Sequence, residues 1–146
     1  MVNQLQPHQI SHLWTAIRES IRRSSTISGP KFDHYLNVIL EGLLSGRHQA
    51  WMAHRRDEDS HEAYGILITS LVSNHFFGHK SLIIDHMYAF RKWDGELVNE
   101  IFESFKTFAE NCGCADIVAH TNNEKAMSMA TRLGFNHVTH KLQFTL

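Results

Sequence analysis

The sequence predicts an α/β (α+β) fold in which helices cover both faces of a mixed, mostly antiparallel sheet. Two amphipathic helical patterns come first, three strand-like segments follow, and a third helix with a further strand comes after them. No linker, repeat or low-complexity tract interrupts this order. The length of 146 residues, with 42% hydrophobic and 20% charged residues, is typical of one globular domain, so residues 1–146 are expected to form a single domain.

The N-terminal third predicts one strand and two helices. A short strand at 3–6 leads through Pro7 into the first helix, because proline suits the first position of a helix. A polar loop at 23–29 comes next. The second helix then begins at Pro30 and is stopped by Gly46. Each helix has one apolar face that should cover the sheet, formed by Ile10, Leu13, Trp14, Ile17 and Ile21 in the first and by Phe32, Tyr35, Leu36, Ile39, Leu40, Leu43 and Leu44 in the second.

The middle of the chain predicts an antiparallel meander. Its strands are expected at 48–53, 63–72 and 80–90, and the turn between the first two is charged. An amphipathic helix at 95–111 leads to a further strand at 115–121. Because a strand, a crossover helix and a strand imply parallel pairing, this further strand should run parallel to its neighbour in the sheet.

The segment after residue 121 contains an asparagine, a short helix and a Gly-Phe stop. Asn123, Ala126, Gly134 and Phe135 keep a spacing that resembles the last conserved block of the GNAT-type N-acetyltransferase superfamily. The family has a tyrosine where this chain has Ala130, and that tyrosine is often the acid that protonates the departing thiolate. The order of predicted elements is also similar to the GNAT fold and covers essentially the whole chain.

The last residues predict one more strand. At 136–146 the residues Val138, His140, Leu142, Phe144 and Leu146 alternate as in a half-buried strand. Members of the family usually have two strands after the Gly-Phe stop, so the final one is expected to be missing. An uncovered sheet edge invites pairing with another chain, which predicts a homodimer or larger assembly unless a bulge or charges blunt the edge.

The resemblance implies acetyl-CoA as the donor. In the family, the pantetheine arm lies between splayed strands four and five, and N–H groups at the start of the following helix hold the pyrophosphate. The corresponding segment keeps at most one glycine, Gly95, and the carboxylates of Asp94 and Glu96 cap the helix but oppose a pyrophosphate. A capped helix without a ligand explains the segment equally well. By resemblance, the donor contacts fall on Tyr88, Ala89, Phe90, Arg91, Lys92, Gly95, Glu96 and Asn123.

Three residues of the fourth strand are candidates for catalysis. Amine acetylation needs a base near the amine and an acid for the thiolate. His86 has the better unperturbed pKa for a base, and Asp85 serves if burial raises its pKa. As neighbours on a strand they should point to opposite faces, so that only one faces a substrate. Tyr88 should share the face of His86, where its hydroxyl is a candidate replacement for the tyrosine absent at Ala130. Packing or local hydrogen bonds would also explain all three.

The leading hypothesis is an acetyltransferase that moves an acetyl group from acetyl-CoA to a primary amine by direct attack. The amine, on a small molecule or a peptide, would lie over the first two helices and the loop at 23–29. The alternative is a GNAT-like module that has lost catalysis and binds a protein partner. GNAT-like proteins of comparable simplicity occur in tailed bacteriophages. Under this alternative, the protein would have a virion-associated or host-directed role.

Composition disfavours several other classes. No apolar run is long enough to span a bilayer, and the first residues lack a signal pattern, so a cytoplasmic protein is expected. A formal charge of -1 disfavours nucleic acid as a partner. Cys112 and Cys114 cannot form a four-ligand zinc site alone, and the 12 histidines lack a ligand pattern, so no metal is expected.

Overall fold

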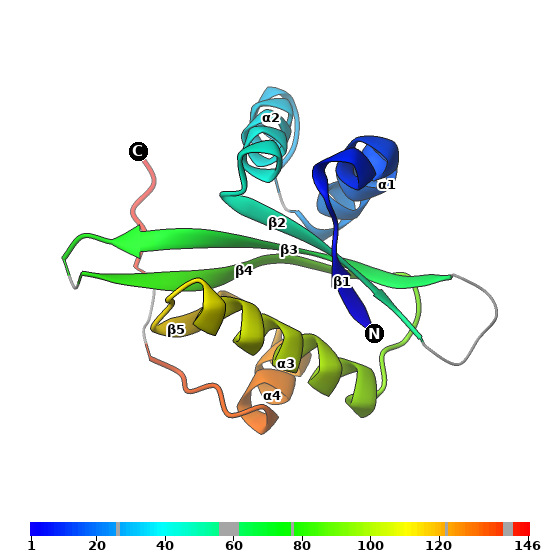
Figure 1. The fold of residues 1–146 in the computed structure, drawn as a ribbon. Helices are drawn as coiled ribbons and strands as arrows, with labels where there is room; N and C mark the ends of the chain where they lie inside the picture. The colour runs from blue at the N-terminus through cyan, green and yellow to red at the C-terminus, as the bar shows by residue number, and fades with distance from the viewer. Residues whose placement is uncertain (26, 56–61, 77, 122, 139–141) are drawn as a thin grey trace.

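A five-stranded sheet forms the centre of the computed structural model, which describes residues 1–25, 27–55, 62–76, 78–121, 123–138 and 142–146 (Figure 1). The strands lie in chain order: β1 (Val2–Gln4), β2 (His48–His54), β3 (Ala63–Asn74), β4 (His79–Ala89) and β5 (Asp116–Ala119). The first four pair antiparallel, and β5 pairs parallel to β4. The predicted mixed, mostly antiparallel sheet is therefore confirmed.

Helices cover both faces of the sheet, as predicted. Figure 1 shows α1 (Pro7–Ser24) and α2 (Pro30–Ser45) on one face, and α3 (Gly95–Asn111) and α4 (Glu124–Arg132) on the other. We refer to these as the α1/α2 face and the α3 face. In the described residues, none of the helices combines the length and the apolar character needed to cross a membrane.

Each face of the sheet has its own hydrophobic core, because successive residues of a strand point to opposite sides. In β3, Ile66 and Ile68 pack against α1 and α2, whereas Leu67 packs against α3. The first core also contains Ile10, Ile17, Ile21, Phe32, Leu36, Ile39 and Leu43, and the second contains Trp51, Leu82, Leu97, Ile101, Phe105 and Ala109. The predicted apolar faces of the helices thus cover the sheet, except that Leu44 of α2, which was predicted to face the core, is 53% exposed.

Glycines follow the ends of α2 and α4, where the sequence predicts them. Gly46 follows α2 with a φ of 85°, in the left-handed region that glycine adopts without a steric penalty. Gly134 follows the last helix with a φ of 100°, and the Phe135 ring then packs 5.3 Å from the Phe102 ring of α3. The Gly-Phe stop therefore fixes α4 against α3.

The strand predicted at 136–146 is wrong for the described part of that segment. Residues 136–138 and 142–146 are not in a strand, and His140 lies outside the described residues. The side chains of Val138, Leu142 and Phe144 are 84%, 95% and 88% exposed. Alternation supplies an apolar face, but a strand also needs a neighbouring edge with which to form a ladder, and residues 136–138 and 142–146 belong to no such ladder. The described sheet therefore ends at β5.

Candidate functional site

β4 continues beyond the end of its pairing with β5. The register joins Ser81 to Asp116 and ends where Ile84 lies opposite Ala119, although β4 runs on to Ala89. In the described part of the chain, the edge of β4 that follows Ile84 has no strand beside it on that side. This free edge presents backbone N–H and C=O groups that a bound molecule could use.

A β-bulge lies at the point where the free edge begins. Ile68 of β3 lies opposite His86, and Thr69 lies opposite Ile84, so that Asp85 is an extra residue in β4. Ile68 points to the α1/α2 face, and His86 therefore does as well. A bulge interrupts the alternation of side chains, which allows Asp85 to turn to the same face.

Contacts confirm that Asp85 and His86 share the α1/α2 face. Asp85 accepts a hydrogen bond from Ser70, which is two residues beyond Ile68 on the same face of β3, and its charge acts on Tyr35 of α2. The prediction that Asp85 and His86 point to opposite faces is therefore wrong. The physical reason is the inserted residue, because two residues of β4 here oppose one residue of β3.

His86 is held through both of its ring nitrogens. Nδ1 lies 3.0 Å from the Ser24 hydroxyl of α1, and Nε2 is hydrogen-bonded to the Tyr35 hydroxyl of α2. Burial lowers the pKa of His86, and the nearby His48 lowers it further. The imidazole is therefore neutral at physiological pH, as a base must be before it takes up a proton.

The carboxyl group of Asp85 has an environment suited to holding or exchanging a proton. Desolvation by the surrounding protein raises its pKa, while the Ser70 hydrogen bond and the charge of His120 act in the opposite direction. The residue nevertheless retains contact with solvent. Asp85 can therefore meet a substrate that approaches from outside.

Tyr88 also lies on the α1/α2 face, as predicted. Nη1 of Arg23 on α1 donates a hydrogen bond of 3.0 Å to the Tyr88 hydroxyl oxygen, and the guanidinium carbon lies 5.9 Å from the centre of the ring. Because Arg23 uses the oxygen as an acceptor, the hydroxyl hydrogen of Tyr88 can still be donated elsewhere. Asp85, His86 and Tyr88 thus line one face of β4.

The N-terminus of α3 already carries a carboxylate. The Asp94 side chain accepts a hydrogen bond of 2.9 Å from the Leu97 N–H, so the predicted helix cap is confirmed, and it also forms an ion pair with Arg55. The first N–H groups of a helix have no partner within it, so those of Gly95 and Glu96 remain for another acceptor. A phosphate group here would lie close to the Asp94 charge.

The loop before α3 folds back on β3. The Trp93 indole N–H donates to the Tyr64 carbonyl oxygen at 2.9 Å, and the Phe90 N–H donates to the same oxygen at 2.9 Å. Arg91 forms an ion pair with Glu62 and lies over the Tyr64 ring. The Arg91 guanidinium, assigned from the sequence to the donor, is thus already paired in this structure.

Of the remaining donor assignments, Asn123 belongs to a different element from the bulge. It caps α4, because its side-chain oxygen accepts from the Ala126 N–H at 3.2 Å. Ala89 pairs with Gly65 at the end of β4, and no ion pair of Lys92 is formed within the described residues. Tyr88, Ala89 and Phe90 thus follow the bulge closely along the chain, whereas Asn123 comes from the start of α4.

Sequence reasoning missed the polar partners of the bulge. Tyr35 was predicted only as a core residue, and the residues Ser24, Ser70 and His48 had no predicted role. Tyr35 and Ser24 lie on helices that are more than 50 residues away from His86 along the chain. The available signal was a tyrosine on the apolar face of a helix, since a buried phenol hydroxyl usually requires a partner.

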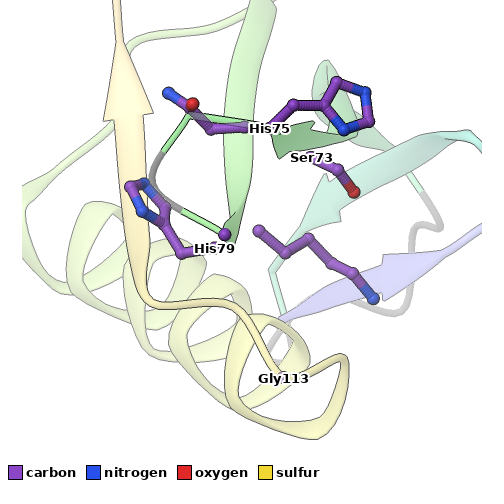
Figure 2. Close-up of a pocket in the computed structure, with 7 residues that line it drawn as sticks. Ser73, His75, His79 and Gly113 are labelled. Atoms are coloured by element: carbon purple, nitrogen blue, oxygen red, sulfur yellow. The ribbon is translucent and has the colours of Figure 1, made fainter.

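A cavity of about 510 Å³ lies elsewhere, at the turn between β3 and β4. It is lined by Ser73, Asn74, His75, Gly78, His79, Lys80 and Gly113 (Figure 2). Figure 2 shows the rings of His75 and His79 well apart rather than converging. No set of three metal-ligating side chains occurs in the portion of the chain that the structure describes. Five residues of extended strand, roughly 17 Å, separate Lys80 from Asp85, so this cavity is distinct from the bulge.

Comparison with solved structures reveals acetyltransferases of the same fold. The aminoglycoside 6'-N-acetyltransferase AAC(6')-Ih from Acinetobacter baumannii is 14% identical, with a TM-score of 0.71 over 100% of this chain and 97% of that one. A predicted acetyltransferase from Clostridium acetobutylicum, solved with acetyl-CoA, is 13% identical, with a TM-score of 0.72 over 99% of this chain and 96% of that one. The chain has the GNAT acetyltransferase fold.

A third GNAT structure is similar to the same extent. The aminoglycoside acetyltransferase HMB0005, from an uncultured soil metagenomic sample, is 16% identical, with a TM-score of 0.70 over 100% of this chain and 97% of that one. No family model matches the sequence, and no curated protein matches it. The likeness to these acetyltransferases is therefore one of fold alone.

The residues of this GNAT fold fit acetyl-CoA in two places. The free edge of β4 supplies backbone groups that suit the amides of a pantetheine arm. At the start of α3, the N–H groups of Gly95 and Glu96 suit a phosphate, although the Asp94 carboxylate acts against it. The residues present thus suit the arm and suit the pyrophosphate less well.

Proposed function

We propose that the protein is an N-acetyltransferase that moves an acetyl group from acetyl-CoA to a primary amine by direct attack. The observation that carries this proposal is the bulge, which puts Asp85 and His86 on one face of β4 at the point where β4 parts from β5. A donor held along the free edge would present its acetyl group beside both side chains. A cytoplasmic enzyme acting on a small-molecule or peptide amine is part of the same proposal.

The donor would be held by β4 and the start of α3. Backbone groups of Tyr88, Ala89 and Phe90 would meet the pantetheine arm, and Gly95 and Glu96 would offer N–H groups to the phosphates, with Lys92 as a nearby cation. Acetyl-CoA supplies an activated acetyl carbonyl carbon as a thioester. Backbone N–H groups on the free edge of β4 would stabilise the negative charge that develops on the carbonyl oxygen.

The α1/α2 face would handle the amine and its protons. The Asp85 carboxylate attracts an ammonium group, and its raised pKa brings it nearer to the range in which it exchanges protons. His86 is neutral because burial lowers its pKa, and it is the second candidate base. Tyr88 would donate its hydroxyl hydrogen to the departing sulfur, a role that Ala130 cannot perform.

Calorimetric titration with acetyl-CoA and with CoA tests the first requirement of the proposal. Saturable binding at micromolar concentrations, followed by amine-dependent release of free thiol, would support it. The Asp85→Asn variant should then lose at least about 100-fold in kcat/KM. Absence of binding at low and at moderate salt would contradict an acetyl-CoA-dependent enzyme.

Two observations favour a second candidate, a non-catalytic module that binds a protein partner. Asp94 places its carboxylate at the helix end where a pyrophosphate would bind, and Ala130 lacks a hydroxyl. This candidate predicts that neither acetyl-CoA nor CoA binds the wild type, while an Asp94→Gly variant does bind them. The fold would then have been retained for binding a protein partner. Size-exclusion chromatography with light scattering would test the homodimer that we propose for either function.

A further inference from the structure

The hydrogen bonds around His86 determine which ring nitrogen carries the proton. The Ser24 hydroxyl lies 3.3 Å from the Ile21 carbonyl oxygen, which can only accept, so Ser24 donates its hydrogen there. With its hydrogen donated there, the Ser24 oxygen is left as an acceptor for Nδ1 of His86, 3.0 Å away. In a neutral imidazole, a proton on Nδ1 leaves Nε2 as an acceptor, and this assignment follows from the network.

The unprotonated nitrogen of His86 therefore faces Tyr35 and not the substrate. Nε2 accepts the hydrogen of the Tyr35 hydroxyl, and the two rings lie 5.7 Å apart between centres with an angle of 60° between their planes. Any proton that reaches Nε2 along this bond passes through the Tyr35 oxygen. The phenol oxygen is thus the outer end of a chain that runs through His86 to Ser24.

Tyr35 also lies near the second candidate base. Burial raises the pKa of Tyr35, and the charge of Asp85 raises it further, which places the phenol within the influence of that carboxylate. The other ionisable groups that act on this cluster are His48 of β2, His120 after β5 and Arg23 of α1. Tyr35 is only half-buried, so part of this residue retains contact with solvent.

We propose that Tyr35 and His86 form a two-residue proton relay that removes the proton of the attacking amine, while Asp85 binds and orients that amine. The inference rests on the proposed acetyl transfer and assigns its base. Tyr35 would contact the substrate and is the catalytic residue, and His86 acts through it. Ser24 positions the imidazole by accepting from Nδ1.

With a neutral primary amine as substrate, the reaction through the relay conserves atoms and charge. The amine nitrogen forms a bond to the carbonyl carbon, its proton passes to the Tyr35 oxygen, and the phenol proton passes to Nε2 of His86. The carbon–sulfur bond breaks, and its electron pair leaves with the sulfur, which takes up one proton. His86 returns one proton to solvent, so the products are an amide and a free thiol.

Steady-state kinetics of four forms of the protein test the relay. The forms are wild type, Tyr35→Phe, His86→Gln and the double variant, measured by thiol release between pH 6 and 9 with an amine that the wild type accepts. Each single variant should lose about 100-fold or more in kcat/KM. The double variant should lose no more than either single one, because the two residues act as a unit. His34→Gln, an exposed histidine on the same helix, is the control and should retain wild-type activity.

The pH profile separates the relay from a packing role. The rise of kcat/KM with pH that reports deprotonation of His86 should be absent in Tyr35→Phe as well as in His86→Gln. Activity of Tyr35→Phe within about threefold of the wild type, or independent losses that multiply in the double variant, would overturn the relay and leave the proposed function standing. A wild type that transfers acetyl to no amine would overturn both.

Nitrogen-15 NMR of the histidines checks the geometry without acetyl transfer. The His86 signals should show a proton on Nδ1 and none on Nε2 at neutral pH. The pKa of His86 should rise in Tyr35→Phe, because the phenol no longer stabilises the neutral ring. A proton on Nε2 in the wild type would contradict the donor assignment and overturn the relay.

Discussion

Replacing Asp94 by asparagine should tighten the binding of acetyl-CoA without removing the helix cap. Asparagine keeps a side-chain oxygen that can accept the Leu97 N–H, now 2.9 Å from Asp94, and the two residues are about equally good caps. The variant loses the negative charge at the helix end. Two unit charges at 4 Å repel by about 1 kcal/mol in water and by more where water is excluded. Removing that repulsion corresponds to an affinity increase of about fivefold or more.

The unfolding free energies of two variants at position 94 separate the effect of the helix cap from the effect of the charge. Asp94→Ala removes the cap and should lower the free energy of unfolding by about 1 kcal/mol more than Asp94→Asn does. Both variants lose the ion pair with Arg55, whose side chains are 40% and 43% exposed, so this loss should be at most about 1 kcal/mol. Both should gain affinity for acetyl-CoA to a similar extent.

Calorimetric titration and urea unfolding provide the two measurements. Glu103→Gln is the matched control, because this exposed α3 residue is paired with Lys106 and lies two turns beyond the helix start. It should change neither the affinity nor the cap. Equal or weaker acetyl-CoA binding by Asp94→Asn would refute the reasoning that the phosphates approach the N-terminus of α3.

Three further outcomes follow from the packing. Gly65→Ala should lower the free energy of unfolding by about 1 to 3 kcal/mol in urea, because a Cβ there would overlap the Trp93 indole, and unchanged stability would show that the ring has room to move. Burial lowers the pKa values of His48 and His86 below 6.5, so the unfolded chain binds more protons as the pH falls below that value. Unfolding at pH 5.5 should therefore require less urea than at pH 7.5, and equal midpoints would contradict the effect. Deleting residues 142–146 should change stability by less than about 0.5 kcal/mol, since their large apolar side chains are almost fully exposed, whereas a larger loss in thermal unfolding would show that they pack.

The helices were predictable because their signals are local. Pro7, Pro30 and Gly46 mark ends at which proline or glycine chemistry acts within a few residues, and the structure places the ends of α1 and α2 there. The Asp94 cap was predictable for the same reason. Strand formation depends on a neighbouring strand, and the segment at 136–146 shows the consequence, because its alternation fits a strand while its described residues are not in one.

The candidate site could be predicted only in part. The sequence identified Asp85, His86 and Tyr88 of β4 as candidates for catalysis, and the structure places all three on one face. The error concerned direction, because a rule of strict alternation put Asp85 and His86 on opposite faces. A bulge is a mismatch between two strands, and nothing in β4 alone reveals that β3 supplies one residue fewer.

The sequence by itself determined the order of helices and strands as far as α4 and the departures at Asp94 and Ala130, because periodicity, capping and residue identity are properties of short segments. The tertiary structure decided which side chains meet. His86 finds Ser24 and Tyr35 only because α1 and α2 pack across the bulge, at sequence separations of 62 and 51 residues. Such contacts depend on the register between strands and on helix packing, which arise only when distant segments fold together.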